Sequence, residues 1–240
     1  MSNGYERSQI GGLIPEAIKY LLIWNVIIYL VQNIISLPSV NHGQDLAGRF
    51  IYLFGMVPAA FWHGRIWQAV TYMFLHGGVF HILINMFILW MFGSDIERVL
   101  GTRRFVSFYF FSGIGAGLLN AVVTPHADIP TVGASGAIYG VLMGYALFFP
   151  HRRVYLYFFL PIPVRVFVIF LAAIALLSSI QPGRDNISHV THLGGFVFGW
   201  LFLRGFGPGD IWRRLRGGGR RRGGMRLIDF TRERDRDRWG

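Results

Sequence analysis

The chain has 240 residues, of which 53% are hydrophobic and only 15% are charged, and its mean hydropathy is +0.44. This composition excludes an ordinary soluble domain, and it excludes intrinsic disorder for most of the chain. The formal net charge is +11, but 11 of the 23 basic residues lie between Arg213 and Arg238. The rest of the chain is close to neutral, which argues against nucleic acid as a partner. Cysteine is absent, so a disulfide framework and a thiolate nucleophile are excluded.

Six apolar stretches are candidates to cross a bilayer as helices, a crossing that takes about 20 residues. In chain order they cover approximately residues 20–37, 79–96, 105–123, 134–149, 164–180 and 189–206, and the fourth and fifth are short. The sequence therefore predicts an all-α membrane protein, a six-transmembrane-helix bundle over residues 20–206. A short cytoplasmic N-terminus, residues 1–19, precedes it.

Residues 38–78 form the predicted outer loop. Its apolar segment, residues 50–62, contains Gly55 and Pro58 and is too short for a crossing, so we expect it to be interfacial. The loops after the second and fourth spans are basic, which places them and both termini in the cytoplasm. The Arg-rich tail, residues 207–240, cannot bury a core and is predicted to be disordered or to lie on anionic headgroups.

Polar side chains inside apolar spans are costly and therefore mark candidate functional sites. His81 and Asn85 share one face of the second span, Ser135 opens the fourth, and His192 lies one turn into the sixth. All three spans start outside, so these residues lie roughly 5–10 Å below the outer surface at about 1.5 Å per residue. A serine beside an imidazole base is an activated nucleophile.

Small residues in two of these spans favour close approach of their helices. The fourth span has glycine at every fourth position, and the sixth has two glycines on the face of His192; these residues are Gly136, Gly140, Gly144, Gly195 and Gly199. Such ridges let helix backbones pack tightly. Ser135 and His192 are therefore predicted to come within hydrogen-bonding reach of each other.

Four segments together resemble the rhomboid family of intramembrane serine proteases. They read GASGAIYG around Ser135, HGGVFHILIN from His76 to Asn85, DIERVLG after the second span, and THLGGFVFG in the sixth. The resemblance covers roughly residues 67 to 199, with the motifs in the family's order and on the corresponding spans. It implies a six-helix bundle with a Ser–His dyad that cleaves transmembrane proteins entering laterally from the lipid.

The resemblance also implies individual roles. Ser135 matches the family's nucleophile and His192 its general base. His76 and Asn85 match the side chains that stabilise the oxyanion together with the Ser135 backbone N–H, and His81 matches a companion of that site. Tyr139, four residues after Ser135, matches the ring on which the base packs.

Some residues depart from the family pattern or compete for a role. Gln68 stands where the family commonly has arginine, after Trp67, which leaves the structural role of that arginine open. His189 precedes His192 by one turn, and we prefer His192 because it matches the family position. Asp128 and Asp185 lie in outer loops, where either is a candidate to orient His192.

Two other kinds of function stay open from the sequence. A non-catalytic rhomboid-like protein that binds membrane proteins for trafficking or degradation would be expected to lack the serine or the base. The other alternative is a small transporter or a metal-handling protein. In a metal site the ligands would be the histidines, namely His76, His81, His189 and His192. We expect neither metal nor cofactor, because no carboxylate accompanies these histidines in the outer half of a span.

The expected substrates are transmembrane proteins cut near their outer boundary, and the expected partner surface is the lipid bilayer. The short soluble regions favour a prokaryotic plasma membrane, with the active site near its outer face. The sequence does not determine the natural substrate, the cleavage residue or the oligomeric state.

Overall fold

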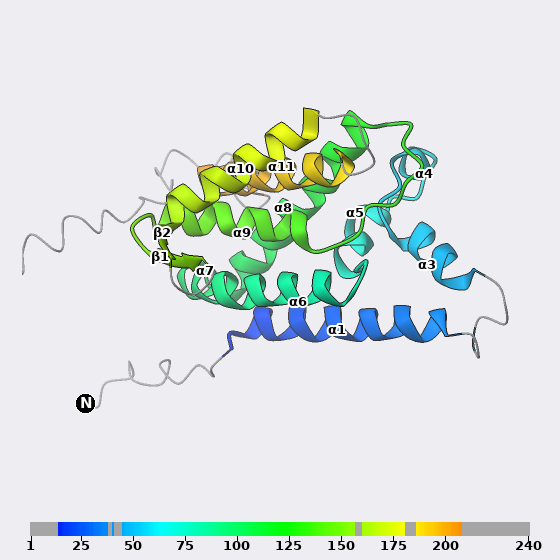
Figure 1. Cartoon of the computed structure of the whole chain (residues 1–240), viewed down its shortest axis with the longest axis horizontal. Helices are drawn as coiled ribbons and strands as arrows, with labels where there is room; N and C mark the ends of the chain where they lie inside the picture. Colours follow the sequence, from blue (N-terminus) through cyan, green and yellow to red (C-terminus); the bar gives the residue numbers. More distant parts are fainter. Residues whose placement is uncertain (1–13, 38–39, 41–44, 157–159, 181–185, 208–240) are drawn as a thin grey trace, which may run out of the picture.

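A computed structural model describes residues 14–37, 40, 45–156, 160–180 and 186–207. The described residues form a helical bundle in which α1 packs beside α6, α9 lies between α6 and the pair α10 and α11, and α8 crosses behind (Figure 1). Residues 1–13 and the basic tail from residue 208 onward lie outside the described part, as does Asp185.

Helices occupy all six predicted spans, with somewhat different ends. They are α1 (Glu16–Ser36), α6 to α7 (Val79–Leu100, with a π-helical turn at Leu89–Gly93), α8 (Thr102–Val123), α9 (Ser135–Phe148), α10 (Val164–Ile180) and α11 (Asn186–Leu201, continued by a π-helical turn at Phe202–Phe206). Among the described residues, α1, the α6 to α7 helix and α8 are long and apolar enough to span a bilayer by themselves. The 14-residue α9 is the shortest of the six and is largely buried, as befits a helix surrounded by protein.

The outer-loop segment 50–62 is divided between two short helices, α3 (Leu46–Phe54) and α4 (Pro58–Trp62), separated by extended residues at Gly55–Val57. Between them, Met56 pairs with Thr131 in an isolated antiparallel bridge. Neither helix has the length of a crossing. The bridge connects the outer loop directly to the chain that enters α9.

Gln68, at the start of α5 (Gln68–Thr71), is fully buried and organises this loop. Its Oε1 accepts from Val57 N at 3.1 Å, and its Nε2 donates to the carbonyls of Tyr52 and Leu53 at 2.9 and 3.3 Å. A neutral amide thus satisfies three backbone groups of the outer loop. The glutamine that departs from the family pattern therefore has a structural role of its own.

Backbone-to-backbone packing joins α9 to α11. A Cβ on Gly195 would lie 2.1 Å from the carbonyl oxygen of Gly136, and a Cβ on Gly199 would lie 2.7 Å from the Cα of Gly140. No side chain fits at either position without separating the helices. The predicted glycine ridges therefore set the distance between the helices that carry Ser135 and His192.

A small hairpin between α9 and α10 was not predicted. Strands β1 (Arg153–Leu156) and β2 (Leu160–Pro163) pair antiparallel in a region that we expected to be a plain loop. Valine, tyrosine and isoleucine in these strands favour extended structure. The hairpin is a minor addition to an otherwise helical fold.

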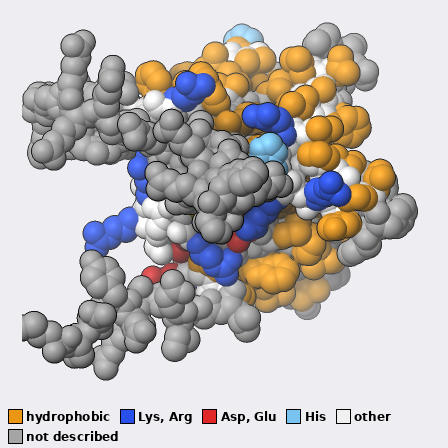
Figure 2. All heavy atoms as spheres, turned by 90° about the vertical axis from the view of Figure 1, so that its left-hand side faces the viewer, with side chains coloured by type: hydrophobic (Ala, Val, Ile, Leu, Met, Phe, Trp, Pro, Cys, Tyr) orange, Lys and Arg blue, Asp and Glu red, His pale blue; other side chains and the backbone are white. Residues whose placement is uncertain are grey.

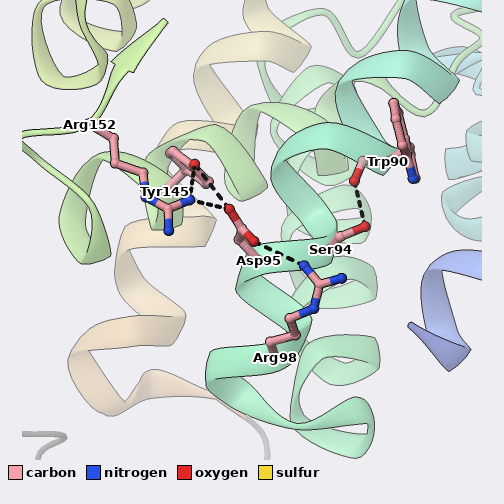
Figure 3. A network of polar contacts seen from close by, with 6 residues as sticks. All are labelled: Trp90, Ser94, Asp95, Arg98, Tyr145 and Arg152. Atoms are coloured by element: carbon pink, nitrogen blue, oxygen red, sulfur yellow. Dashed lines mark hydrogen bonds and ion pairs between the residues drawn. The ribbon is translucent and has the colours of Figure 1, made fainter. Parts of the chain in front are cut away.

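The opposite end of the bundle from Ser135 carries exposed arginines and lysine (Figure 2). There, Asp95 of α7 accepts from Arg98 at 3.1 Å, from Tyr145 of α9 at 3.1 Å and from Arg152 (Figure 3). These bonds connect α7 to α9 and to Arg152, the residue before β1. Asp95 is therefore the centre of a polar cluster at this end of the bundle.

Glu97 of α7 forms a second polar contact at this end and is only 2% exposed. Its two carboxylate oxygens accept from Ala17 N and Ile18 N at 2.9 and 3.0 Å, and Thr102 Oγ1 donates to it at 2.8 Å. The carboxylate satisfies backbone donors in the first turn of α1, where a negative charge also complements the helix dipole.

Candidate active site

Ser135 is the first residue of α9 and is reached through a turn at Gly133. Gly133 has φ +125°, a conformation that L side chains rarely adopt, and its N–H donates to Tyr72 O at 2.9 Å. The turn ends at a helix N-terminus, where the first backbone N–H groups have no acceptor within the helix. Ser135 is half-buried.

His192 of α11 lies against this serine. Its Nε2 is 3.0 Å from Ser135 Oγ, although the two residues are 57 positions apart. The distance follows from the glycine contacts between α9 and α11. A hydroxyl and an imidazole at this separation are within reach for proton transfer.

The ring of His192 is fixed by aromatic packing. Tyr139, one turn after Ser135, stacks on it with centroids 4.2 Å apart and planes 8° apart, and Phe196 packs edge-on against Tyr139 at 4.9 Å. His189 lies 6.1 Å from His192 between ring centroids. His192, the histidine preferred from the sequence, is the one hydrogen-bonded to Ser135.

His81 and Asn85, on one face of α6, point at the turn before Ser135. A Cβ on Gly133 would lie 2.8 Å from His81 Nε2 and 3.7 Å from Asn85 Nδ2. Asn85 is 5% exposed, and its Nδ2 has no acceptor among the described residues. An amide donor that is buried without a partner is costly, and here it faces the region beside the nucleophile.

The His76 ring, expected at the oxyanion site, is fully buried and packs edge-on against His81, with centroids 5.2 Å apart. Neither of its ring nitrogens has a hydrogen-bond partner among the described residues. His81 presents its Nε2 toward Gly133. The helical face shared with Asn85 accounts for this, because His81 precedes Asn85 by four residues whereas His76 lies outside the helix.

Gln32 of α1 is a site-associated residue that the sequence analysis missed. Its Nε2 donates to His76 O at 2.7 Å, and its Oε1 accepts from His76 N at 3.2 Å. The sequence did offer a signal for it, because Gln32 is a polar residue inside the first predicted span. Polar residues inside spans are the criterion that identified His81 and Asn85 as candidates.

Asp128, one of the two candidate third members of a triad, has its contact in the outer loop. There it accepts a 2.7 Å hydrogen bond from Tyr52 OH, and this bond raises the pKa of Tyr52. Asp185 lies outside the described residues. Within the described ranges, no three His, Asp or Glu side chains are grouped so as to hold a metal ion.

Comparison with protein families gives an independent result. The family model for the rhomboid domain matches residues 63–208, which is more than half of the chain. The chain belongs to the rhomboid family. It is an integral membrane protein with a mostly helical rhomboid fold, in agreement with the resemblance found in the sequence.

Several curated relatives are rhomboid proteins. Rhomboid protein 1, mitochondrial, of Saccharomyces cerevisiae is 34% identical over 134 residues, 54% of this chain and 38% of the relative. Presenilin-associated rhomboid-like protein, mitochondrial, of Mus musculus is 32% identical over 146 residues, with shares of 58% and 38%. Rhomboid protease GluP of Bacillus subtilis is 30% identical over 146 residues, with shares of 60% and 27%.

The matched part of this rhomboid covers less than two fifths of the length of each of these three relatives. Two of them are named as mitochondrial and one comes from a bacterium. Because the relatives differ in the membrane they point to, they do not support the expectation of a prokaryotic plasma membrane.

Proposed function

We propose that this rhomboid is an intramembrane serine endopeptidase that hydrolyses peptide bonds in or near the transmembrane segments of other proteins. The observation that carries the proposal is the 3.0 Å separation of His192 Nε2 and Ser135 Oγ at one end of the bundle. Family membership supports the same activity. Hydrolysis by a Ser–His dyad uses neither metal nor organic cofactor.

In the proposed reaction, Ser135 Oγ attacks the scissile carbonyl carbon while His192 Nε2 accepts the hydroxyl proton. The C–N bond then breaks as His192 returns this proton to the leaving amine. Water attacks the resulting ester, again with His192 as base, and releases Ser135. Stacking on Tyr139 holds the imidazole in one orientation through both half-reactions.

The oxyanion is proposed to lie between the start of α9 and α6. Asn85 Nδ2, His81 Nε2 and the Ser135 backbone N–H are its donors, so the oxyanion role expected for His76 passes to His81. Fixed donors of this kind are worth about 2.7–4 kcal/mol each in acyl-transfer chemistry. The supporting observation is that both side chains face Gly133, two residues before the nucleophile.

Substrate helices must unwind locally, because a hydrogen-bonded helical backbone shields its carbonyl carbon. Residues that weaken a helix, such as glycine or serine at the cut and helix breakers beyond it, are therefore the preferred sequence. Lateral entry from lipid accords with the half-buried positions of Ser135 and His192.

The proposed topology places both termini in the cytoplasm and the dyad near the outer face. Its domain division is a short N-terminus (residues 1–19), the membrane domain (20–206, with the outer loop at 38–78) and a basic tail (207–240), disordered or in contact with anionic headgroups. The exposed basic end of the bundle, opposite Ser135, agrees with the inside-positive rule (Figure 2).

The purified protein in proteoliposomes, incubated with a reporter transmembrane substrate, tests the function. Cleavage is expected for the wild type, with and without EDTA, and should vanish in Ser135→Ala and in His192→Ala. The matched control is Ser107→Ala, because Ser107 is an exposed serine of α8 whose hydroxyl bonds only its own helix. This variant should cleave at the wild-type rate.

The outcomes separate the three kinds of function. Loss of cleavage on chelation would favour a metal enzyme. Absence of cleavage by a folded wild type that still captures the substrate would favour the non-catalytic binding factor. Cleavage that survives Ser135→Ala would contradict the dyad.

A further inference from the structure

The hydrogen bonds around His76 connect α1 to the proposed oxyanion site. The carbonyl of His76 and the N–H of Gly77 belong to one peptide unit. That carbonyl accepts from Gln32 Nε2 at 2.7 Å, and that N–H donates to His81 Nδ1 at 3.2 Å. Gln32 and His81 therefore bond to opposite ends of the same peptide group.

Gln32 also fixes the preceding peptide unit. Its Oε1 accepts from His76 N at 3.2 Å, so one amide side chain makes two bonds to a single residue of the loop. Gln32 is 9% exposed and His76 is fully buried, which limits competition from solvent for these bonds. Tyr29, one turn earlier on α1, packs edge-on against the His76 ring at 6.5 Å. The peptide before Gly77 is therefore held in one orientation by α1.

The orientation of this peptide decides which nitrogen of His81 carries the proton. A neutral imidazole has one donor and one acceptor nitrogen. Because Nδ1 accepts from Gly77 N, the proton resides on Nε2, the atom that faces Gly133. A hydrogen bond to the carbonyl end of a peptide also polarises its N–H end and strengthens the bond that the N–H donates.

From these contacts we propose that Gln32 is a positioning residue for His81: through the His76–Gly77 peptide it selects the tautomer and ring orientation that aim the Nε2 proton at the oxyanion. The inference rests on the proposed function, since it assigns His81 a role in that reaction. Gln32 itself does not touch the substrate. Its contribution is to keep the His81 Nε2–H group directed at the oxyanion position before the substrate binds.

Gln32→Met preserves the length of the side chain and removes both hydrogen bonds. The expected result is a kcat lower by about 10-fold, the usual scale for loss of a residue that orients a functional group, with KM little changed. Asn33→Ala is the matched control, because Asn33 is the exposed neighbouring amide and its Nδ2 bonds only Tyr29 O within α1. This control should match the wild type.

A double-mutant cycle separates positioning from general stabilisation of the fold. In a His81→Ala background, Gln32→Met should change kcat by less than about twofold, because the two residues act through one path. An equal fold-loss in both backgrounds, an unchanged kcat in the single variant, or an equal loss in Asn33→Ala would each overturn the proposal.

Nitrogen NMR of histidine-labelled protein gives a readout that does not depend on cleavage. The wild type should show His81 with a protonated Nε2 and an unprotonated Nδ1, and Gln32→Met should show a mixture of tautomers. An unaltered His81 signal would contradict the positioning role. Cleavage that survives Ser135→Ala would overturn the proposed function while leaving the tautomer result to stand by itself.

Discussion

A few polar side chains of this rhomboid are buried without a hydrogen-bond partner among the described residues, which is unfavourable unless they have a function. Asn85 is the clearest example, since its amide Nδ2 is buried and has no acceptor among the described residues. A transition-state oxygen would supply that acceptor, and an interaction made only in the transition state raises kcat. His81 faces the same turn but is only half-buried, and its Nδ1 accepts a hydrogen bond from Gly77 N.

Asn85→Ala is therefore expected to lower kcat by about 10²–10³-fold, the range for loss of one oxyanion donor. Because Nδ2 has no described partner in the resting protein, thermal unfolding of the variant should stay close to the wild type. Steady-state cleavage and a thermal melt in the same detergent measure both quantities. A wild-type kcat would remove Asn85 from the oxyanion role.

At the scale of elements, two contacts hold the site together from a distance. The α9–α11 interface sets the separation of Ser135 and His192, and Glu97 fixes α1 against α7. These contacts come from very different chemistry, glycine backbones in one case and a buried carboxylate in the other. Each leads to its own mutational test.

Gly195→Val tests the first contact. The Cβ would meet the Gly136 carbonyl at 2.1 Å, so the helices must separate and the dyad distance must grow. Overpacking of this kind costs about 1–3 kcal/mol in typical cores, and we expect a lower Tm together with loss of cleavage. Val197→Ala, an exposed change two residues along α11, is the control. Wild-type cleavage by Gly195→Val would show that the close approach is dispensable.

Glu97→Gln tests the second contact. The amide supplies one acceptor oxygen where the carboxylate supplied two, so one backbone N–H of α1 loses its partner, at a cost of about 1–3 kcal/mol. The free energy of unfolding should fall, as measured by a melt or a denaturant titration. Glu16→Gln, an exposed change in the same first turn of α1, should have a much smaller effect. Equal effects of the two changes would argue against a special role for the buried carboxylate.

For the whole molecule, the sequence predicted the helices and the approach of Ser135 to His192, but not the connections between the helices. The catalytic role of the pair stays a prediction. Apolar runs of crossing length predict helices because the bilayer leaves the backbone few alternatives, and the glycine ridges indicated that the fourth and sixth spans pack closely. Ser135, His192 and Tyr139 followed from motif and helical face.

The features that the sequence did not predict depend on turns and on single hydrogen bonds between residues far apart in the chain. The spacing of His76, His81 and Asn85 does not say which imidazole faces α9, because that depends on the orientation of the His76–Gly77 peptide. Likewise, the bonds of Gln68 to three backbone groups depend on how the outer loop folds back, which no local pattern specifies.

The region shared with the family, residues 63–208, begins after α1. A chain trimmed to that region would keep every side chain of the Ser135 site but would lose α1. With α1 it would lose the Gln32 amide that bonds the His76 backbone, and the first-turn N–H groups that bond Glu97. The region shared with the family is therefore shorter than the part of the chain that these contacts connect. A truncated or chimeric version of the protein should keep α1 as well as residues 63–208.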